Sequence, residues 1–209
     1  MIGKFIVFEG GEGSGKTTQI ELLEQKLRDN GFVVFRTREP GGTNCPISEK
    51  IRGLLKDPAN KKMVAETELF LFLASRAQHV QQVIRPQLAQ GAIVLCDRFY
   101  GSTLAYQHFA RGLFNLDEVI KLNDFATHGL EPDATVLLNI DPEIGLARIK
   151  DQLAACRLDS EKLDFHKRVQ SGYLTLAKIK PNWLVVSADN TVQIIHETIW
   201  NKVSELLKP

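Results

Sequence analysis

The feature that most constrains this chain is the segment Gly10–Thr17, which reads Gly-Gly-Glu-Gly-Ser-Gly-Lys-Thr. Its glycines let successive backbone N–H groups turn inward around a phosphate, and a loop of this kind joins a strand to a helix. The flanks agree, because Lys4–Glu9 is typical of a buried strand and Lys16–Asn30 has helical spacing. We therefore predict a phosphate-binding loop. In it Lys16 reaches the β- and γ-phosphates of a nucleotide and Thr17 offers its hydroxyl to Mg²⁺.

Short apolar runs that fit strands alternate along the chain with longer segments that fit helices. Strands are expected at Lys4–Glu9, Val33–Thr37, Ile93–Asp97, Thr135–Ile140 and Leu184–Ser187. Helices are expected at Lys16–Asn30, Ile47–Leu55, Glu66–Gln90, Leu116–His128, Glu143–Lys150 and Ser160–Ile179, with a closing helix from Val192 to Leu206. This alternation favours a three-layer α/β P-loop fold. We expect a five-stranded parallel sheet with helices on both faces, formed by residues 1–209 as one domain.

The overall composition argues against several classes of protein. The 209 residues carry 26 Lys and Arg against 25 Asp and Glu, so no bulk positive charge attracts nucleic acid or an anionic membrane. The longest apolar run, Leu69–Ala74, is far too short to span a bilayer. Cys45, Cys96 and Cys156 lie far apart, which suits a reducing compartment better than a metal site. We expect a cytoplasmic protein with no nucleic-acid or membrane partner.

A second acidic position follows the apolar run Ala92–Cys96. Asp97 ends this expected strand, and parallel strands bring their carboxyl ends to one edge of a sheet, where ligands bind. A carboxylate there can hold Mg²⁺ or orient an arginine. Arg98 follows at once, and its planar guanidinium matches phosphate oxygens. The less favoured interpretation is an aspartate that caps a turn and pairs with a surface arginine.

Two further groups of residues fit either a binding or a structural role. Arg38–Thr43 reads Arg-Glu-Pro-Gly-Gly-Thr after the second expected strand, and it suits an oxyanion clamp or a plain surface loop. Phe72 and Arg76 lie four residues apart and share one helix face. An aromatic ring beside an arginine suits stacking on and hydrogen bonding to a nucleobase, but it also suits a packed core. The spacing alone leaves both interpretations open.

The class of nucleotide-binding protein follows by elimination. The chain lacks the Asn-Lys-x-Asp motif with which regulatory GTPases usually read guanine. Motor and transporter ATPases are usually larger and carry partner domains. A lone domain of this size, with several charged and glycine-rich loops, suits a kinase that acts on a small molecule.

Together these motifs resemble the bacterial thymidylate kinases, a family of the nucleoside monophosphate kinase class. The matching segments are Phe8–Gly10, Glu12–Thr18, Thr37–Thr43, Glu49–Arg52, Leu71–Phe72, Ser75–His79, Asp97–Phe99, Ser102–Gln107, Arg111–Gly112, Pro132–Asp133, Arg157–Asp159 and Phe165–His166. The most specific part is the combination of Arg-Glu-Pro-Gly-Gly-Thr with Asp-Arg-Phe and Ala-Tyr-Gln. The resemblance implies ATP-dependent phosphorylation of dTMP to dTDP with Mg²⁺, by a homodimer.

The resemblance also implies which residues bind each substrate. The ATP-binding residues would be Gly10, Gly11, Glu12, Gly13, Ser14, Gly15, Lys16, Thr17 and Thr18. The dTMP-binding residues would be Glu12, Arg38, Glu39, Arg52, Phe72, Arg76, Arg98, Ser102, Thr103, Tyr106 and Gln107. Thr17 and Asp97 would serve the metal, directly or through water.

Individual roles follow from the same resemblance. Phe72 would stack on thymine, Arg76 would bond a thymine carbonyl, and Thr103 and Gln107 would touch the base. Arg38, Arg52 and Arg98 would gather the acceptor phosphate, with Asp97 orienting Arg98. Glu12 would reach the 3′-hydroxyl, and Tyr106 would fill the place of a ribose 2′-hydroxyl.

The resemblance places a short lid at approximately residues 148–158. The phosphate loop itself has no basic residue between Glu12 and Lys16, so a further catalytic cation must come from the lid. Arg148, Lys150 and Arg157 are candidates, whereas Gln152 stands where some relatives carry an arginine. We expect Arg157 to be the main lid cation, with Arg148 second. The expected catalytic set is Lys16, Asp97, Arg98, Arg148 and Arg157.

Two other hypotheses remain open at this point. One is a kinase of another nucleoside monophosphate or of a deoxynucleoside. A deoxynucleoside kinase needs a general base near a sugar hydroxyl, whereas the arginines here indicate a phosphate acceptor. The other is a non-catalytic nucleotide-binding module, which would keep the phosphate loop but would need neither Asp97–Arg98 nor the Phe72 and Arg76 pair.

Overall fold

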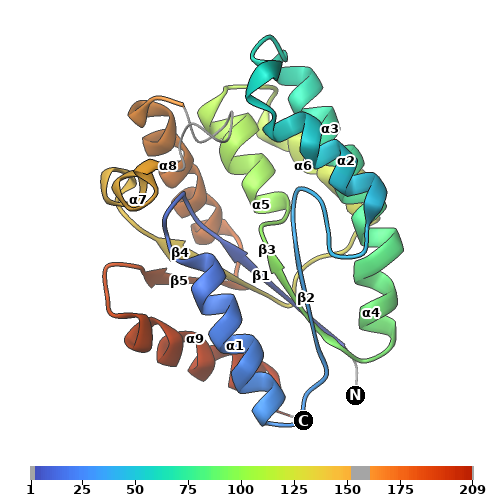
Figure 1. The fold of residues 1–209 in the computed structure, drawn as a ribbon, viewed down its shortest axis with the longest axis vertical. Helices are drawn as coiled ribbons and strands as arrows, with labels where there is room; N and C mark the ends of the chain where they lie inside the picture. Colours follow the sequence, from blue (N-terminus) through green and yellow to red (C-terminus); the bar gives the residue numbers. More distant parts are fainter. Residues whose placement is uncertain (1–2, 152–160, 209) are drawn as a thin grey trace.

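The computed structural model describes residues 3–151 and 161–208. Within these ranges the chain forms one five-stranded sheet in which every pair of neighbouring strands is parallel. The strands are β1 (Lys4–Glu9), β2 (Val34–Arg38), β3 (Ile93–Asp97), β4 (Ala134–Asn139) and β5 (Trp183–Ser187), in the spatial order β2-β3-β1-β4-β5. The predicted α/β fold with a five-stranded parallel sheet is thus confirmed (Figure 1).

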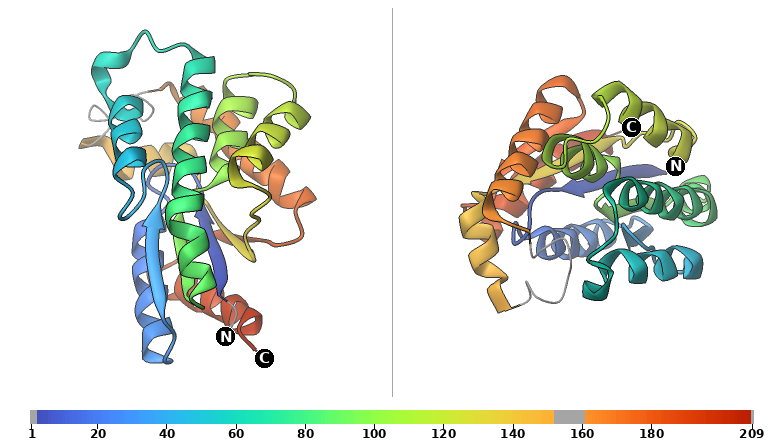
Figure 2. Two further views of the ribbon diagram at one scale, coloured as in Figure 1. Left: turned by 90° about the vertical axis from the view of Figure 1, so that its right-hand side faces the viewer. Right: turned by 90° about the horizontal axis from the view of Figure 1, so that it is seen from above.

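Helices cover both faces of this sheet (Figures 1 and 2). The helical elements are α1 (Lys16–Asp29), α2 (Pro46–Lys56), η1 (Pro58–Asn60), α3 (Ala65–His79), η2 (Val80–Ile84), α4 (Arg85–Ala89), α5 (Tyr100–Thr103), η3 (Leu104–Ala110), α6 (Leu116–Thr127), α7 (Pro142–Arg148), α8 (Leu163–Ile179) and α9 (Val192–Leu206). Among the described residues, no helix is both long enough and apolar enough to cross a membrane.

The period of two along the strands explains the three layers. In β1, Ile6 and Phe8 pack with α1 and α9 on one face, whereas Phe5 and Val7 pack with α3, α6 and α8 on the other. All four side chains are buried. A strand that is buried on both faces has the continuous apolar sequence seen at the start of the chain. The sheet therefore forms the centre of the core and leaves its carboxyl edge for polar residues.

Two helical segments differ from the sequence expectation. The expected helix Glu66–Gln90 is divided by the wider, π-helical turn η2, and Pro86 lies just beyond this turn. Proline has no N–H to donate to the carbonyl four residues earlier, so the regular ladder cannot continue there. Sequence analysis assigned no element to residues 100–110, where α5 and η3 form against α8. Glycine, serine and threonine at the start of this segment give a weak local signal for a helix.

Helix boundaries near the lid also differ from the expectation. The last long helix before β5 begins at Leu163, whereas Ser160, its expected start, lies outside the described residues. In the segment expected from Glu143 to Lys150, α7 ends at Arg148. Most of the expected lid, residues 152–158, is outside the described ranges.

Gly172 in α8 lies against Phe109 of η3, so a substitution at Gly172 can test how closely these two elements pack. A Cβ on Gly172 would lie 2.7 Å from Cβ of Phe109, closer than two carbon atoms can approach. Alanine normally stabilises a helix interior relative to glycine by about 0.5–1 kcal/mol. We expect Gly172→Ala to reverse this sign and to lower the free energy of unfolding by about 1–3 kcal/mol, because it overpacks the contact.

Denaturant unfolding measures this effect, and Gly53→Ala in α2 is the matched control. A Cβ at Gly53 meets nothing within 4 Å, so this change should leave stability unchanged or raise it. Equal and favourable effects at both positions would contradict the close packing of α8 on η3.

Candidate active site

The phosphate loop forms the turn between β1 and α1. Gly10, Gly13 and Gly15 have φ values of 145°, 66° and 87°, which residues with a Cβ rarely adopt. The helix α1 begins at Lys16 with no side-chain cap and with no acidic residue in its first turn. The first backbone N–H groups of α1 and the positive end of its dipole are therefore available to an anion.

The Lys16 side chain folds back over this loop. Its ammonium group donates to the carbonyl oxygens of Gly10 (3.1 Å) and Gly11 (2.9 Å) and to Oγ of Ser14 (3.2 Å). Burial, together with the positive charge of Arg98, lowers the pKa of Lys16. The cation is thus held inside the loop, where phosphate oxygens can replace the carbonyl groups as its partners.

Arg98 connects the end of β3 to the phosphate loop. Its Nη2 donates to Oε1 of Glu12 (2.7 Å), and its Nη1 donates to the Gly10 carbonyl (3.0 Å) and to the Tyr173 hydroxyl (3.1 Å). The carboxylate that binds Arg98 is therefore that of Glu12, whereas we expected Asp97 to orient this arginine. The cause is the left-handed backbone of Arg98 (φ 69°), which turns its side chain over the loop and toward Glu12.

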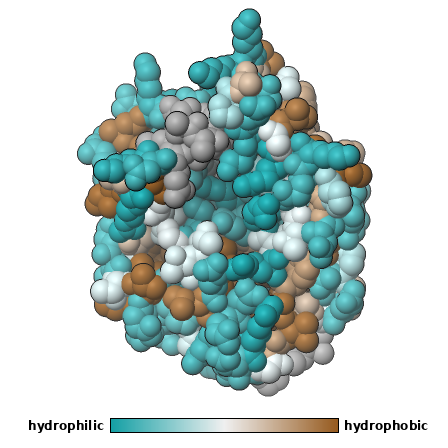
Figure 3. All heavy atoms as spheres, in the orientation of Figure 1, coloured by the Kyte–Doolittle hydropathy of each residue, from teal (hydrophilic) through white to brown (hydrophobic). Residues whose placement is uncertain are grey.

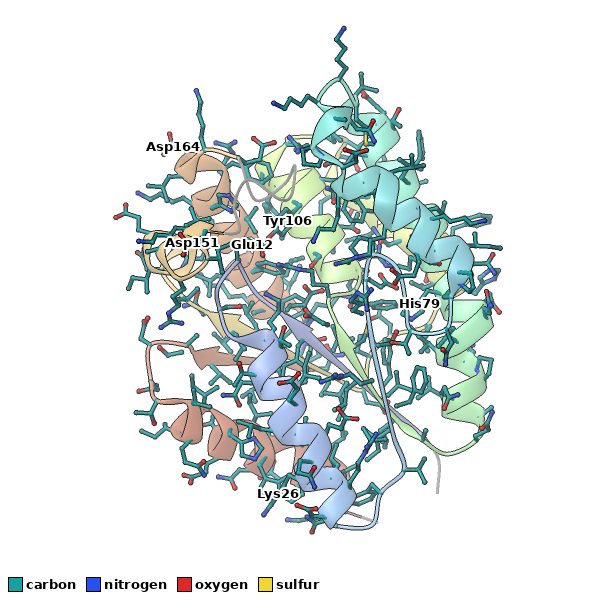
Figure 4. The ribbon with its side chains drawn as sticks, viewed as in Figure 1. Glu12, Lys26, His79, Tyr106, Asp151 and Asp164 are labelled. Carbon is teal, nitrogen blue, oxygen red and sulfur yellow. The ribbon has the colours of Figure 1, made fainter. Side chains whose placement is uncertain are left out.

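Glu12 is the carboxylate at the centre of the site (Figure 4). It accepts from Arg98 and from the Tyr106 hydroxyl, which is 2.8 Å from Oε1. Burial by itself would raise the pKa of Glu12, but the charges of Arg98 and Lys16 lower it to about 2. Glu12 is therefore ionised at neutral pH and acts there as an acceptor.

Two more arginines lie on the other side of the site, around the loop that follows β2. Nη2 of Arg38 donates to both carboxylate oxygens of Glu49, at 3.0 and 3.1 Å. Oε1 of Glu49 also accepts from the backbone N–H of Gly42 (2.8 Å), and Nη1 of Arg52 donates to the Pro40 carbonyl (2.7 Å). These hydrogen bonds hold the loop after β2 between Arg38, at the end of that strand, and the helix α2.

Arg76 is a deeply buried charge, with 1% of its surface exposed. Its Nε donates to Oε2 of Glu39 (2.8 Å), Nη1 donates to the Thr103 hydroxyl (2.8 Å) and to Asn123, and Nη2 donates to the Phe99 carbonyl (3.0 Å). These contacts use four of the five N–H groups of a guanidinium. Arg76 is therefore held in one orientation at the wall of the site.

One cavity of about 400 Å³ lies between the phosphate loop, the loop after β2 and the arginines Arg38, Arg52, Arg76 and Arg98. The predicted site residues in its wall are Glu12, Gly13, Ser14, Gly15, Lys16, Thr17, Arg38, Glu39, Arg52, Phe72, Arg76, Asp97, Arg98, Ser102, Thr103, Tyr106 and Gln107. Figure 3 shows a hollow with hydrophilic surroundings in the upper half of this face. The wall does not include Gly10, Gly11, Thr18 or Arg148, and Arg157 lies outside the described residues.

Sequence analysis missed several residues of this site. Pro40, Leu55, Lys56, Phe99 and Ile149 also line the cavity. Helical spacing could have found Lys56, which lies four residues after Arg52 on α2. No local signal marks Tyr173, whose hydroxyl reaches Arg98 from α8.

The site can hold a magnesium ion beside the phosphate loop. Oδ1 of Asp97 is buried and has no hydrogen-bond partner within the described part of the chain. Asp97 shares the cavity wall with Thr17. One carboxylate and one hydroxyl suit Mg²⁺, which keeps several waters and takes its other ligands from phosphates.

The sequence and the fold of this chain are similar to those of known proteins. The family model for thymidylate kinase matches residues 8–199. The chain belongs to the thymidylate kinase family. It is 50% identical over 199 residues to the thymidylate kinase of Geotalea daltonii, with 91% of this chain and 92% of the relative covered. It is 43% identical over 210 residues to that of an Exiguobacterium species, with 100% and 97% covered.

A solved structure in the family supports the fold over the full length. The crystal structure of thymidylate kinase from Ehrlichia chaffeensis superposes with a TM-score of 0.77 at 32% identity. The superposition covers 97% of this chain and 98% of the Ehrlichia chain. The resemblance seen in the sequence motifs is therefore confirmed for the chain as a whole.

The lid arginine that falls within the described residues lies outside the cavity. Nη1 of Arg148 is 3.3 Å from the Gly13 carbonyl, and its Nη2 is 3.5 Å from the Ala188 carbonyl. Arg148 therefore lies against the outer side of the phosphate loop, close to the β5–α9 connection. A Cβ on Gly13 would collide with the backbone of Gly145, so α7 rests directly on the loop.

The lowered pKa of Glu12 predicts how its contribution to stability varies with pH. The folded-state pKa of about 2 is below the ordinary value of 4.5. The stabilisation by ionised Glu12 is therefore complete above about pH 4.5 and decreases as the pH falls toward 2. We expect Glu12→Gln to lower the free energy of unfolding at pH 6 and to lower it by a smaller amount at pH 3.5, where the Glu12 carboxyl of the unfolded chain is mostly protonated.

Denaturant titrations at both pH values test this prediction. Glu197→Gln, on the exposed side of α9, is the control and should show a small effect at each pH. A destabilisation by Glu12→Gln that is the same at pH 6 and pH 3.5 would mean that Arg98 and Lys16 do not hold the carboxylate ionised.

Proposed function

We propose that this chain transfers the γ-phosphoryl group of ATP to dTMP and so forms dTDP and ADP. The observation that carries the proposal is one cavity that contains the phosphate loop, with Arg98 over it, and two more arginines, Arg38 and Arg52, on the other side. Two anionic nucleotides can meet there end to end, because fixed positive charge offsets the repulsion between their phosphates. Membership of the thymidylate kinase family agrees with this reaction.

Phosphoryl transfer needs positioning and electrostatic stabilisation rather than a covalent intermediate. Lys16 and the N–H groups of the phosphate loop would hold the ATP phosphates. Arg38, Arg52 and Arg98 would gather the acceptor phosphate, which is already a nucleophile. Their guanidinium groups stabilise the charge that moves from the γ-phosphate to the leaving ADP.

Thr17 and Asp97 would hold Mg²⁺, Asp97 directly or through water. The unpartnered buried oxygen of Asp97 supports this assignment. When bound, the ion supplies positive charge to the β- and γ-phosphate oxygens. ATP and Mg²⁺ are the only small molecules, apart from dTMP, that the proposed reaction needs.

The other end of the cavity would recognise the nucleoside of dTMP. Phe72 offers a ring for stacking, and the fifth N–H group of Arg76, on Nη2, suits a pyrimidine carbonyl. Thr103 and Gln107 lie in the same wall.

Tyr106 and Glu12 would read the sugar. Their hydrogen bond places the phenol and the carboxylate together in the cavity. Glu12 would accept the 3′-hydroxyl, and the Tyr106 ring would occupy the space of a 2′-hydroxyl. This arrangement favours deoxyribose.

We also propose a homodimer, as the resemblance implies. The exposed apolar side chains of α3 and α6 support it, because Phe70 is 55% exposed and Phe125 is 80% exposed. Large aromatic side chains with this exposure are typical of contact surfaces between proteins.

A panel of acceptors tests the proposed function. With ATP and Mg²⁺, we expect dTMP to be the preferred acceptor, dUMP to be weaker and ribonucleotides to be poor substrates, because of Phe72, Arg76, Thr103 and Tyr106. ADP release with each nucleoside and nucleoside monophosphate is the measurement. Faster turnover of AMP, CMP or GMP than of dTMP would contradict the substrate, and tight nucleotide binding without turnover of any acceptor would favour a non-catalytic module.

The two central cations give separate kinetic predictions. Lys16→Ala removes a donor to the transferring phosphate and should lower kcat by roughly a hundredfold or more, by analogy with the loss of an oxyanion donor. Arg98→Ala should raise the KM for dTMP and also lower kcat, since this guanidinium faces the acceptor. Steady-state kinetics and a thermal unfolding curve for each variant are the measurements. Kinetics near those of the wild type in either variant would rule out the role given to that residue.

The lid prediction separates Arg157 from Arg148. The resemblance supports Arg157 as the main lid cation, and the position of Arg148 on the outer side of the loop agrees with a secondary role. Arg157→Ala should lower kcat far more than it raises the KM for dTMP, because the contact forms in the transition state. A collapse of kcat in Arg148→Ala alone would reverse the assignment.

A further inference from the structure

His79 lies in α3 and is completely buried, yet the proposed reaction gives it no role. Its Nδ1 is 3.1 Å from Oε1 of Glu39, and its Nε2 is 2.7 Å from Oγ1 of Thr37. Figure 4 shows His79 next to the loop that follows β2. The imidazole therefore joins a residue of β2 to the first residue after that strand, through α3.

The donors and acceptors around His79 fix one direction of hydrogen bonding. The carboxylate of Glu39 only accepts, so Nδ1 of His79 carries a hydrogen and donates it to Oε1 of Glu39. In the tautomer with its hydrogen on Nδ1, Nε2 accepts from the Thr37 hydroxyl, whose Oγ1 also accepts from the backbone N–H of Thr43 at 3.1 Å. The resulting chain of bonds runs from Thr43 through Thr37 and His79 to the Glu39 carboxylate.

The two ends of this series of hydrogen bonds lie next to different residues that line the cavity, Arg76 and Arg38. At one end, Oε2 of Glu39 binds Nε of Arg76 at 2.8 Å, on the side of the base. At the other end, Thr43 closes the loop that begins with Arg38, on the side of the acceptor phosphate. The loop also packs on the imidazole itself, because a Cβ on Gly42 would overlap the His79 ring.

We propose that His79 is a positioning residue that sets the base-reading arginine and the phosphate-binding loop of the acceptor site in one geometry. Its Nδ1 orients Glu39, and so orients Arg76. Its Nε2 orients Thr37, and so holds the loop from Arg38 to Thr43. The inference rests on the proposed function, because it concerns how the same cavity selects and holds dTMP.

A buried polar chain of this kind is well suited to fix geometry. Each bond forms in a medium of low dielectric constant, and a partner that is removed leaves a buried donor or acceptor unsatisfied. The Glu39–Arg76 pair and the loop from Arg38 to Thr43 therefore cannot shift independently without breaking one of these hydrogen bonds. An apolar side chain at position 79 would fill the space but would orient neither Glu39 nor Thr37.

Two amide substitutions separate the two nitrogens. The amide of asparagine reaches the position of Nδ1, and the amide of glutamine reaches the position of Nε2. His79→Asn thus keeps the bond to Glu39 and loses the bond to Thr37, whereas His79→Gln does the reverse. Thr37→Val removes the loop-side bond while the imidazole stays in place, and it provides a second test that does not alter His79.

The two variants should affect different kinetic parameters. The acceptors dUMP and dCMP differ along one edge of the base: uracil presents N3–H and a 4-carbonyl, whereas cytosine presents an unprotonated N3 and a 4-amino group. The ratio of kcat/KM for dUMP to that for dCMP therefore reports on the groups that contact this edge, of which Arg76 is the proposed partner of the carbonyl. We expect His79→Gln to lower this ratio roughly tenfold, because Glu39 loses a buried partner. We expect His79→Asn and Thr37→Val to keep the ratio, and to raise the KM for dTMP roughly fivefold or more through the loosened loop. The KM for ATP should stay within about twofold of the wild-type value in all three, since other elements hold the phosphate loop.

His128→Asn is the matched control. His128 ends α6 in the left-handed conformation that asparagine accepts, and it should show wild-type kinetics. The proposal is overturned if His79→Gln and His79→Asn are indistinguishable, whether both are normal or both are equally impaired, or if their effects are reversed. A wild-type chain that fails to phosphorylate dTMP contradicts the proposed function itself, whereas normal wild-type turnover with indistinguishable variants contradicts only the role of His79.

Discussion

Glu9, at the end of β1, is 1% exposed, and its carboxylate ties together the elements that build the site. It accepts from the backbone N–H groups of Phe99 and Ser102 (3.0 Å each), from the Ser102 hydroxyl (2.6 Å) and from the Tyr173 hydroxyl (3.0 Å). Burial raises the pKa of Glu9, while the bond from Ser102 and the charge of Arg98 act against that rise. A buried carboxylate with these four bonds joins β1 to the turn after β3 and to α8. The left-handed conformation of Arg98, which lies within that turn, depends on this junction.

Three arginines of the cavity each hold a carboxylate before any substrate binds. The Arg76 and Glu39 pair is almost fully buried, whereas the side chains of Arg38 and Glu49 are 45% and 37% exposed. An exposed pair contributes little and exchanges partners easily, but a buried charge that loses its partner is costly. Arg76 is therefore rigid, whereas Arg38 can exchange Glu49 for another anion. Arg98 is intermediate, since its side chain and that of Glu12 are 16% and 19% exposed.

Much of the fold and the composition of the site could be predicted from the sequence. The loop Gly10–Thr17 gives a local signal because its glycines and its Lys-Thr end are required within eight consecutive residues. The strands β1, β3 and β4 also give a local signal in the sequence, because both of their faces are apolar. The helical segment at residues 100–110 gave only a weak local signal, since its glycine, serine and threonine are poor helix formers and it packs on α8. Glu12 as the partner of Arg98 was also missed, because a contact between residues 86 apart has no local pattern.

The sequence by itself determined the alternation of strands and helices, the phosphate loop and the family, because each of these is encoded in spacing along a short stretch of chain. Only the tertiary structure decided which carboxylate meets which arginine, where the π-helical turn forms and how His79 joins β2 to the loop beyond it. The bond between Tyr173 and Glu9 spans 164 residues, and it exists only because the sheet and α8 place the two side chains together. Such contacts depend on the position of whole elements in space, which no short stretch of sequence specifies.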